Sequence, residues 1–104
     1  MISVKVTYTV KPSFVAQNRE NIDQFIQDFK NMGSNDFRYT VYLLKDGKTF
    51  VHHSIYKDEQ IQKVLLDTPS FKSFQQKRDE SGLEGEPKIE VLQMIASSHD
   101  LLAS

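Results

Sequence analysis

The sequence predicts an α+β domain of the ferredoxin-like type, with the element order β-α-β-β-α-β over residues 1–104. Three observations predict it. Residues 2–10 alternate between apolar and polar side chains, residues 14–32 carry apolar side chains at helical spacing, and an Asp46-Gly47 turn separates two further alternating runs. We expect a single domain: a four-stranded antiparallel sheet with two helical segments on one face and an open face on the other.

The first strand, 2–10, directs its apolar side chains to one face and its lysine and threonines to the other. The helix over 14–32 begins after Ser13, a good N-cap residue, and ends before Gly33, which suits the left-handed position that closes many helices. Its apolar stripe contains Phe25 and Phe29, which we expect to face the sheet.

The two middle strands cover 37–45 and 48–56 and form a hairpin around Asp46-Gly47. The hairpin register decides which side chains of the third strand face the helices, because a slip of one residue exchanges the two faces. We prefer a three-residue loop, which gathers Val51 with the other aliphatic residues on the helix side. A two-residue loop gives the opposite assignment.

The remaining elements follow from capping and breaking residues. Asp58 is a suitable N-cap for a second helix, and Thr68-Pro69 interrupts that helix and restarts it. A turn-rich loop leads into the last strand, 88–96, and a short tail follows.

Composition excludes several functions. The chain has 13 Lys and Arg against 14 Asp and Glu, a formal net charge of -1 and no long run of one sign, so we expect neither a nucleic-acid nor a membrane partner. It has no cysteine, which excludes disulfides, thiolate catalysis and cysteine-ligated metals. The N-terminus resembles neither a signal peptide nor a membrane span, so we expect a cytoplasmic protein.

The open face of the sheet is the expected functional surface. With the preferred register it carries three aromatic side chains among polar ones, too large an apolar patch to remain in water. A second copy packed over it would leave a cavity between the two sheets, so we expect a homodimer. The residues expected to line this cavity are Lys5, Thr7, Arg38, Thr40, Tyr42, Phe50, Ser54 and Tyr56.

The adjacent His52 and His53 cannot bind one metal together, because neighbouring strand residues point to opposite faces. No acidic residue lies on either neighbouring strand to complete a site, and we expect no metal. His52 is expected to face the cavity and His53 the helices. An ordinary histidine at the edge of the core is the simpler interpretation of His53.

The element order, the stretch FVHHSIYKDE and above all DTPSFKSF (67–74) resemble the antibiotic biosynthesis monooxygenase-like family of the dimeric α+β barrel superfamily. Thr68, Pro69, Phe71 and Phe74 match the second-helix pattern of that family. The resemblance implies a dimeric barrel, and members include cofactor-independent oxygenases of phenols and quinols as well as haem-degrading enzymes.

The chain departs from the family at several positions. Leu65 and Ser70 stand where the second-helix pattern commonly has histidine, and Ser54 stands where the third strand often has glutamate. The haem-degrading branch uses asparagine, tryptophan and histidine where this chain has Thr7, Tyr56 and Leu65. Haem degradation by that route is therefore not expected.

Two functions of different class remain. The first is a cofactor-independent oxygenase acting on an aromatic or quinoid molecule, with His52 as general base, Arg38 or Lys5 stabilising the anion, and Tyr42 and Tyr56 orienting the ring. The second is a non-catalytic homodimer that binds a small molecule or fills its cavity with side chains and water. The residues leave open whether the protein is an enzyme.

Overall fold

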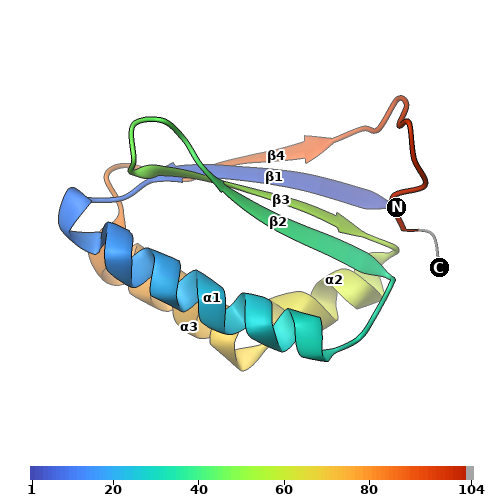
Figure 1. The fold of residues 1–104 in the computed structure, drawn as a ribbon, viewed down its shortest axis with the longest axis horizontal. Coiled ribbons are helices and arrows are strands. Elements are labelled where there is room, and N and C mark those ends of the chain that lie inside the picture. The colour runs from blue at the N-terminus through green and yellow to red at the C-terminus, as the bar shows by residue number, and fades with distance from the viewer. Residues whose placement is uncertain (103–104) are drawn as a thin grey trace.

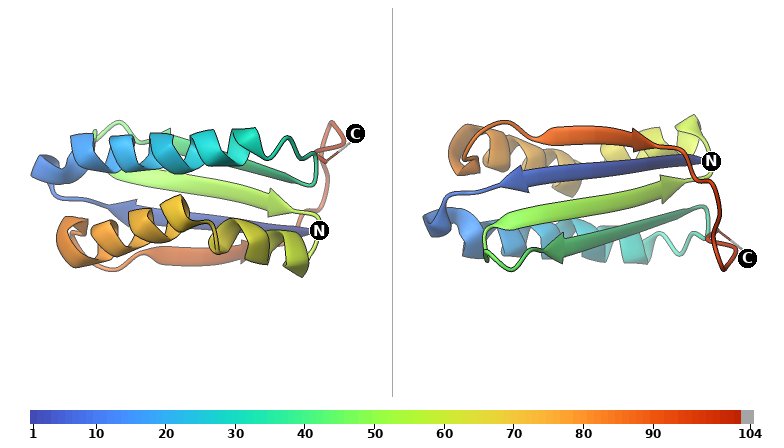
Figure 2. Two further views of the ribbon diagram at one scale, coloured as in Figure 1. Left: turned by 90° about the horizontal axis from the view of Figure 1, so that it is seen from below. Right: turned by 90° about the horizontal axis from the view of Figure 1, so that it is seen from above.

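A computed structural model describes residues 1–102 and shows one sheet with helices on one face (Figures 1 and 2). The strand order is β2-β3-β1-β4 and all neighbouring strands are antiparallel, which confirms the predicted fold class. The strands are β1 (Ile2–Thr9), β2 (Phe37–Leu43), β3 (Thr49–Tyr56) and β4 (Lys88–Leu92), and the helices are α1 (Val15–Asn31), α2 (Glu59–Leu66) and α3 (Pro69–Lys77). None of the helices in residues 1–102 is long and apolar enough to cross a membrane.

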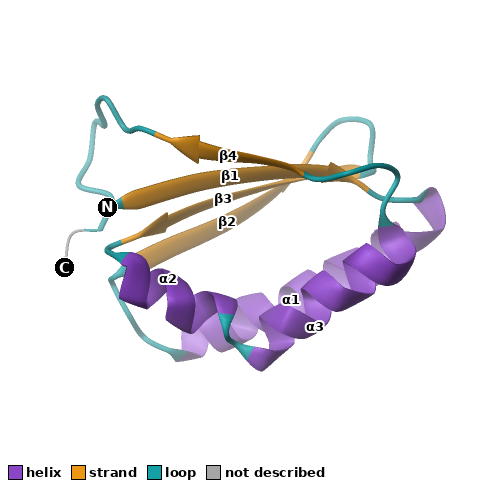
Figure 3. Cartoon of the chain, turned by 180° about the vertical axis from the view of Figure 1, so that it is seen from behind, coloured by secondary structure: helices purple, strands orange, loops and turns teal. Residues whose placement is uncertain are grey.

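The element boundaries follow from local chemistry. The Asp58 carboxylate accepts a hydrogen bond from the Ile61 amide at 2.9 Å and caps α2, and Gly33 adopts φ +59° after α1, both as predicted. Pro69 starts α3 after a break that is visible in Figure 3. Ser13 is not the N-cap of α1, because it lies within a short 3₁₀ turn, η1 (Pro12–Phe14).

The last strand is shorter than predicted. It ends at Leu92, whereas the sequence pattern extends it to residue 96. The segment 93–102 runs outside the sheet, and its Ile95 side chain is exposed. The alternation of apolar and polar side chains continues beyond the last residue that pairs with β1, so the pattern alone overestimates the length of the strand.

The hairpin register differs from the preferred one. Leu43 pairs with Phe50, and the Leu44 amide donates to the Thr49 carbonyl at 2.8 Å, so the loop has four residues, 45–48. The Asp46 carboxylate accepts from the amides of Lys48 and Thr49, and Gly47 supplies the positive φ. This register gives the face assignment of the two-residue alternative.

The prediction that β3 directs its even-numbered side chains to the open face was therefore wrong. The pairing of Val6 and Val41 with His52 places the even-numbered side chains of β3 on the helix side, where they are buried. The residues that move to the helix side are Phe50, His52, Ser54 and Tyr56. Those that lie on the open face as predicted are Lys5, Thr7, Arg38, Thr40 and Tyr42.

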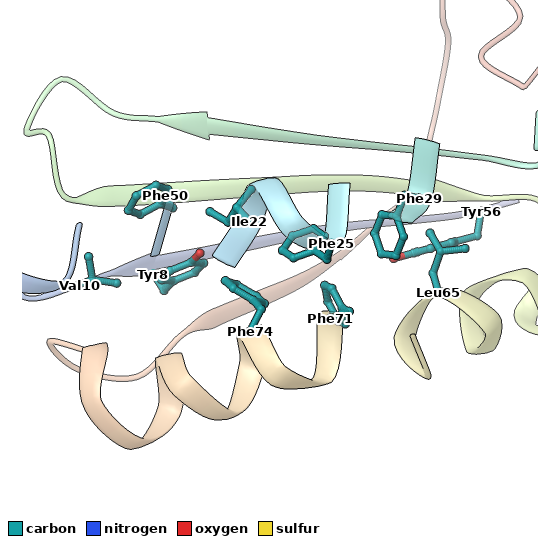
Figure 4. Close-up of a cluster of buried hydrophobic side chains, with 10 residues drawn as sticks. All are labelled: Tyr8, Val10, Ile22, Phe25, Phe29, Phe50, Tyr56, Leu65, Phe71 and Phe74. Carbon is teal, nitrogen blue, oxygen red and sulfur yellow. The ribbon is translucent and has the colours of Figure 1, made fainter. Parts of the chain in front are cut away.

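The physical reason is the aromatic character of the core. Figure 4 shows rings from both layers meeting between the sheet and the helices, with Phe25 and Phe74 fully buried and 4.9 Å apart between ring centroids. Tyr8 and Phe50 stack on the sheet at 5.7 Å. Burying the large rings of β3 removes more apolar area from water than burying its aliphatic residues would.

Candidate functional site

A cavity of about 240 Å³ lies between the sheet and the layer formed by α2 and α3. Its size suits a small aromatic molecule, since cavities of ~150 Å³ bind benzene and pockets for larger ligands begin near ~300 Å³. We call it the helix-side cavity. It is lined by Val4, Val6, Tyr39, His52, Ser54, Tyr56, Gln62, Leu66, Phe71, Phe74, Gln75, Arg78, Pro87 and Ile89.

His52 sits in this wall and uses both ring nitrogens. Nε2 lies 2.7 Å from the Tyr8 hydroxyl and Nδ1 lies 2.7 Å from the Tyr39 hydroxyl. The Asn18 side-chain amide donates to the Tyr8 hydroxyl at 3.0 Å, and the His52 ring stacks on Phe74. We call Asn18, Tyr8, His52 and Tyr39 the His52 network.

Burial keeps His52 neutral. It lowers the pKa of the imidazole from 6.5 to about 3, and the nearby positive charge of Arg78 acts in the same direction. Burial also raises the pKa of the Tyr8 and Tyr39 hydroxyls above their ordinary value. The His52 network is therefore uncharged near neutral pH, and its four members are joined by hydrogen bonds between neutral groups.

Arg78 is the one charged residue among those that line the cavity in the described part of the chain. Its side chain is 11% exposed, and its Nε forms an ion pair with Asp79 at 2.9 Å. The guanidinium carbon lies 5.1 Å from the Tyr8 ring centroid and 5.3 Å from that of Phe74. Its remaining N–H groups give the cavity a positively charged hydrogen-bond donor.

The turn that begins at Arg78 is a π-helical segment, η2 (Arg78–Gly82), which directly continues α3. It is held to the residue that precedes η1 by the Lys11 amide, which donates to the Gly82 carbonyl at 2.8 Å. A side chain at position 82 would meet the Phe14 ring, since a Cβ there would lie 2.5 Å from a ring carbon. Glycine at this position allows the close packing that fixes the base of the turn.

The structure divides the predicted site residues between two surfaces. Ser54, Tyr56 and His52 line the helix-side cavity, whereas Phe50 is buried on the same face but lies outside it. The others lie on the opposite face and are not brought together with His52. These open-face residues are Lys5, Thr7, Arg38, Thr40 and Tyr42.

Sequence reasoning missed the polar partners of His52 and the arginine. Neither Tyr39 nor Asn18 is among the residues predicted for the site, and the Asn18 side chain is fully buried. Arg78 follows Phe74 by four residues, so it lies on the same face of a helical segment. That spacing was a usable signal.

No group of three His, Cys, Asp or Glu side chains suited to a metal ion occurs within residues 1–102. The His52 nitrogens are both engaged by tyrosine hydroxyls, so the imidazole presents no free ligand atom to the cavity. The wall of the helix-side cavity suits an uncharged or anionic organic molecule.

Comparison with known proteins shows the fold. Neither the family models nor the curated proteins give a match to this sequence. Among solved structures, a protein provisionally described as an antibiotic biosynthesis monooxygenase from Bacteroides thetaiotaomicron aligns with a TM-score of 0.82 at 12% identity, over 95% of this chain and 93% of its own. Rv0793 from Mycobacterium tuberculosis gives a TM-score of 0.78 at 17% identity, over 94% and 98% of the two chains.

SnoaB from Streptomyces nogalater, described as a cofactor-independent oxygenase, aligns with a TM-score of 0.71 at 13% identity, over 95% of this chain and 97% of its own. At these identities the likeness is one of fold. It confirms that the chain has the fold of antibiotic biosynthesis monooxygenase-like proteins, as the sequence resemblance implied.

Proposed function

We propose that the protein binds a phenolic or quinoid aromatic molecule in the helix-side cavity and oxidises it with molecular oxygen, without a cofactor. The observation that carries this proposal is the His52 network, which reaches the wall of an otherwise largely apolar cavity beside a largely buried guanidinium. An aromatic ring fits among Phe71, Phe74 and Tyr56, and Arg78 stabilises a negative charge on its oxygen. The fold that this chain shares with SnoaB supports the same reading.

The proposed reaction needs only the substrate anion and oxygen. A phenol that has lost its proton transfers electron density to oxygen, which forms a bond to the ring carbon para to the hydroxyl. The resulting peroxide loses water together with the ring hydrogen and leaves a second carbonyl. One phenol and one oxygen molecule therefore give one quinone and one water.

His52 is a weak base for this reaction. Complete transfer of a proton from a phenol of pKa ~10 to an imidazole of pKa about 3 is uphill by ~10 kcal/mol before any compensation. The phenol proton therefore leaves to water, and Arg78 lowers the pKa of the bound phenol. His52 instead orients the Tyr39 hydroxyl. This positioning role takes the place of the general-base role that was expected for His52 from the sequence.

Filling the cavity is expected to abolish binding. Ser54 is buried at its wall, and Ser54→Leu places a branched apolar side chain where the ligand ring would lie. With wild-type protein we expect oxygen uptake at an electrode with 1-naphthol, whose ring carbon para to the hydroxyl carries a hydrogen, above the uncatalysed rate. The Ser54→Leu variant should lose at least ~90% of that uptake, as when a positioned substrate loses its binding geometry.

His53→Ala is the matched control, because His53 lies next to His52 on the opposite face and should leave uptake unchanged. Aromatic ligands that raise the melting temperature of the wild type without oxygen uptake would support the non-catalytic alternative. Absence of both responses would contradict both functions.

We also propose that the open face pairs with a second copy of the chain. Of the three aromatic residues expected there, only Tyr42 is on this face, 55% exposed and accompanied by the exposed Leu44. No helix covers the face in residues 1–102, as the right-hand view of Figure 2 shows. The pairing thus rests on an uncovered sheet with apolar side chains rather than on an aromatic cluster.

Tyr42→Lys is expected to weaken this pairing, because it places an unpaired charge at the contact and disfavours burial by several kcal/mol. Sedimentation at micromolar concentration should show a wild-type species of twice the 12.0 kDa chain mass and a partly dissociated variant. Gln27→Lys on the exposed side of α1 should leave the mass unchanged. A stable wild-type monomer would contradict the proposal.

A further inference from the structure

The His52 network has a property that the proposed function does not require. Each of its four members can act as hydrogen-bond donor and as acceptor: a primary amide, two hydroxyls and a neutral imidazole. The members follow one another in a single line from α1 across the sheet to the cavity wall. A line of this type can in principle donate in either direction.

We propose that the His52 network reverses its direction of donation with the ligand, so that Tyr39 presents a hydrogen to a quinone carbonyl and a lone pair to a phenol hydroxyl. The inference rests on the proposed function and adds that one site accommodates both members of a phenol–quinone pair. Tyr39 is the contact residue, and Tyr8, His52 and Asn18 are positioning residues that act through it.

The first direction runs from Asn18 to the cavity. The amide donates to the Tyr8 oxygen, the Tyr8 hydroxyl donates to Nε2 of His52, and Nδ1–H donates to the Tyr39 oxygen. The Tyr39 hydrogen is then free to donate to a ligand that only accepts, such as a quinone.

The second direction runs from the cavity to Asn18. Tyr39 donates to Nδ1, Nε2–H donates to the Tyr8 oxygen, and the Tyr8 hydroxyl donates to the amide oxygen of Asn18 after the amide rotates by half a turn. The free site on Tyr39 is now a lone pair, which accepts from a phenol hydroxyl.

The two directions contain the same number of hydrogen bonds. In the arrangement shown, the Asn18 amide oxygen is buried without a partner, and half a turn of the amide exchanges that oxygen for its nitrogen. The count of unpaired buried atoms therefore does not change. Because the two directions are equal in hydrogen bonds and in unpaired buried atoms, one added hydrogen bond from a ligand selects between them in this proposal.

The surroundings keep the network closed to competing partners. Asn18, Tyr8 and His52 are all buried, with exposures of 0%, 2% and 2%. Phe74 stacks on the imidazole and Phe25 packs against it. The direction is thus set at the two ends, by the rotation of Asn18 and by the ligand at Tyr39.

The test is the tautomer of His52, measured from the nitrogen chemical shifts of its imidazole in isotope-labelled protein. With a benzoquinone probe we expect the Nδ1–H tautomer, and with a naphthol probe kept in its neutral, hydrogen-bond-donating form at a pH well below its pKa we expect the Nε2–H tautomer. A purely structural histidine would keep one tautomer with both probes. One tautomer in both complexes would overturn the inference.

Asn18→Leu provides a second readout. Without the amide, the Tyr8 hydroxyl has only His52 as a partner, and the second direction would leave its hydrogen buried and unpaired. The variant should hold the Nδ1–H tautomer and bind naphthol ~10-fold more weakly relative to benzoquinone than the wild type does. An unchanged ratio of the two dissociation constants would contradict the proposal.

Tyr39→Phe tests the proposal without substituting the fully buried Asn18, because Tyr39 is only half-buried. This variant should bind each probe with no difference in the His52 tautomer between the two complexes. A tautomer that still switches would contradict the role of Tyr39. Binding without switching in the wild type overturns this inference alone, whereas absence of binding by both probes overturns the proposed function with it.

Discussion

Acidifying the protein from pH 7 to pH 4 is expected to lower its free energy of unfolding by about 3 kcal/mol through His52 alone. Burial holds the folded-state pKa of this imidazole at about 3, against 6.5 in the unfolded chain. The unfolded chain therefore binds the proton more tightly, so the contribution to stability is complete above pH ~6.5 and is lost progressively as the pH falls toward 3. Between these values the slope approaches ~1.4 kcal/mol per pH unit.

Urea unfolding at a fixed protein concentration, repeated at half-unit pH steps, measures this slope. The His52→Gln variant keeps a side chain that donates and accepts hydrogen bonds but does not titrate. The slope of its unfolding free energy against pH, between pH 6.5 and 4, should therefore be smaller than that of the wild type by ~1.4 kcal/mol per pH unit. His53→Gln, on the opposite face, should retain the wild-type slope. Equal slopes in wild type and His52→Gln would show that the imidazole is not buried in its neutral form.

The carboxylate of Asp46 contributes in a different range. Its hydrogen bonds from Thr49 and from the Lys48 amide hold its pKa below the ordinary value, so its stabilisation is lost only as the pH falls below about 4. This range overlaps that of His52 only below pH 4. Of these two residues, His52 alone therefore contributes to the slope between pH 6.5 and 4.

Most of the fold could be predicted from the sequence because its signals are local. A period of two in 2–10, a period of 3.6 in α1, the Asp58 cap and the Pro69 restart each depend on neighbouring residues. The strand order then follows from the β-α-β-β-α-β order of elements. Ser13 was misassigned because Pro12 places it in a 3₁₀ turn rather than at the helix boundary.

The face assignment of β3 could not be predicted in the same way. The segment FVHHSIY has apolar side chains on both faces of the strand. One hairpin register directs its aliphatic side chains toward the helices and the other directs its aromatic ones, and each register buries one histidine. The buried one is acceptable because Tyr8 and Tyr39, distant in sequence from His52, meet its two nitrogens. Such pairing becomes visible only when the strands are placed beside one another.

The observed register of β3 also changes the location of the candidate site, from the open face to the helix side of the sheet. A search for function on the open face found Lys5, Arg38 and Tyr42, which lie on the far side of the sheet from His52. The helix-side cavity needs side chains from both layers, and its one charge comes from Arg78 in a π-helical turn. Sequence periodicity assigns residues to faces, but it does not show where two packed layers leave a space.

Arg78→Gln is expected to weaken binding of an ionised phenol by 10- to 100-fold, because a hydrogen bond to a charged group contributes ~1.5 to 3 kcal/mol. The guanidinium lies largely buried at the cavity, and glutamine retains polarity there while removing the charge. Titration of a naphthol at a pH above its pKa measures the effect, and kcat/KM for oxygen uptake should fall by a similar factor. Lys77→Gln, adjacent and exposed, is the control and should change neither quantity.

The same variant tests the electrostatic link between Arg78 and His52. The positive charge of Arg78 is the second cause of the lowered pKa of His52, after burial, so Arg78→Gln should raise that pKa and narrow the acid window in which stability is lost. Arg78→Lys should keep the lowered pKa yet restore phenolate binding only in part, because an ammonium lacks the planar pair of donors. Loss of phenolate binding with an unchanged acid profile would place Arg78 beside the ligand but too far from His52 to act on it. An altered acid profile with unchanged binding would remove Arg78 from the site and contradict the proposed anion contact.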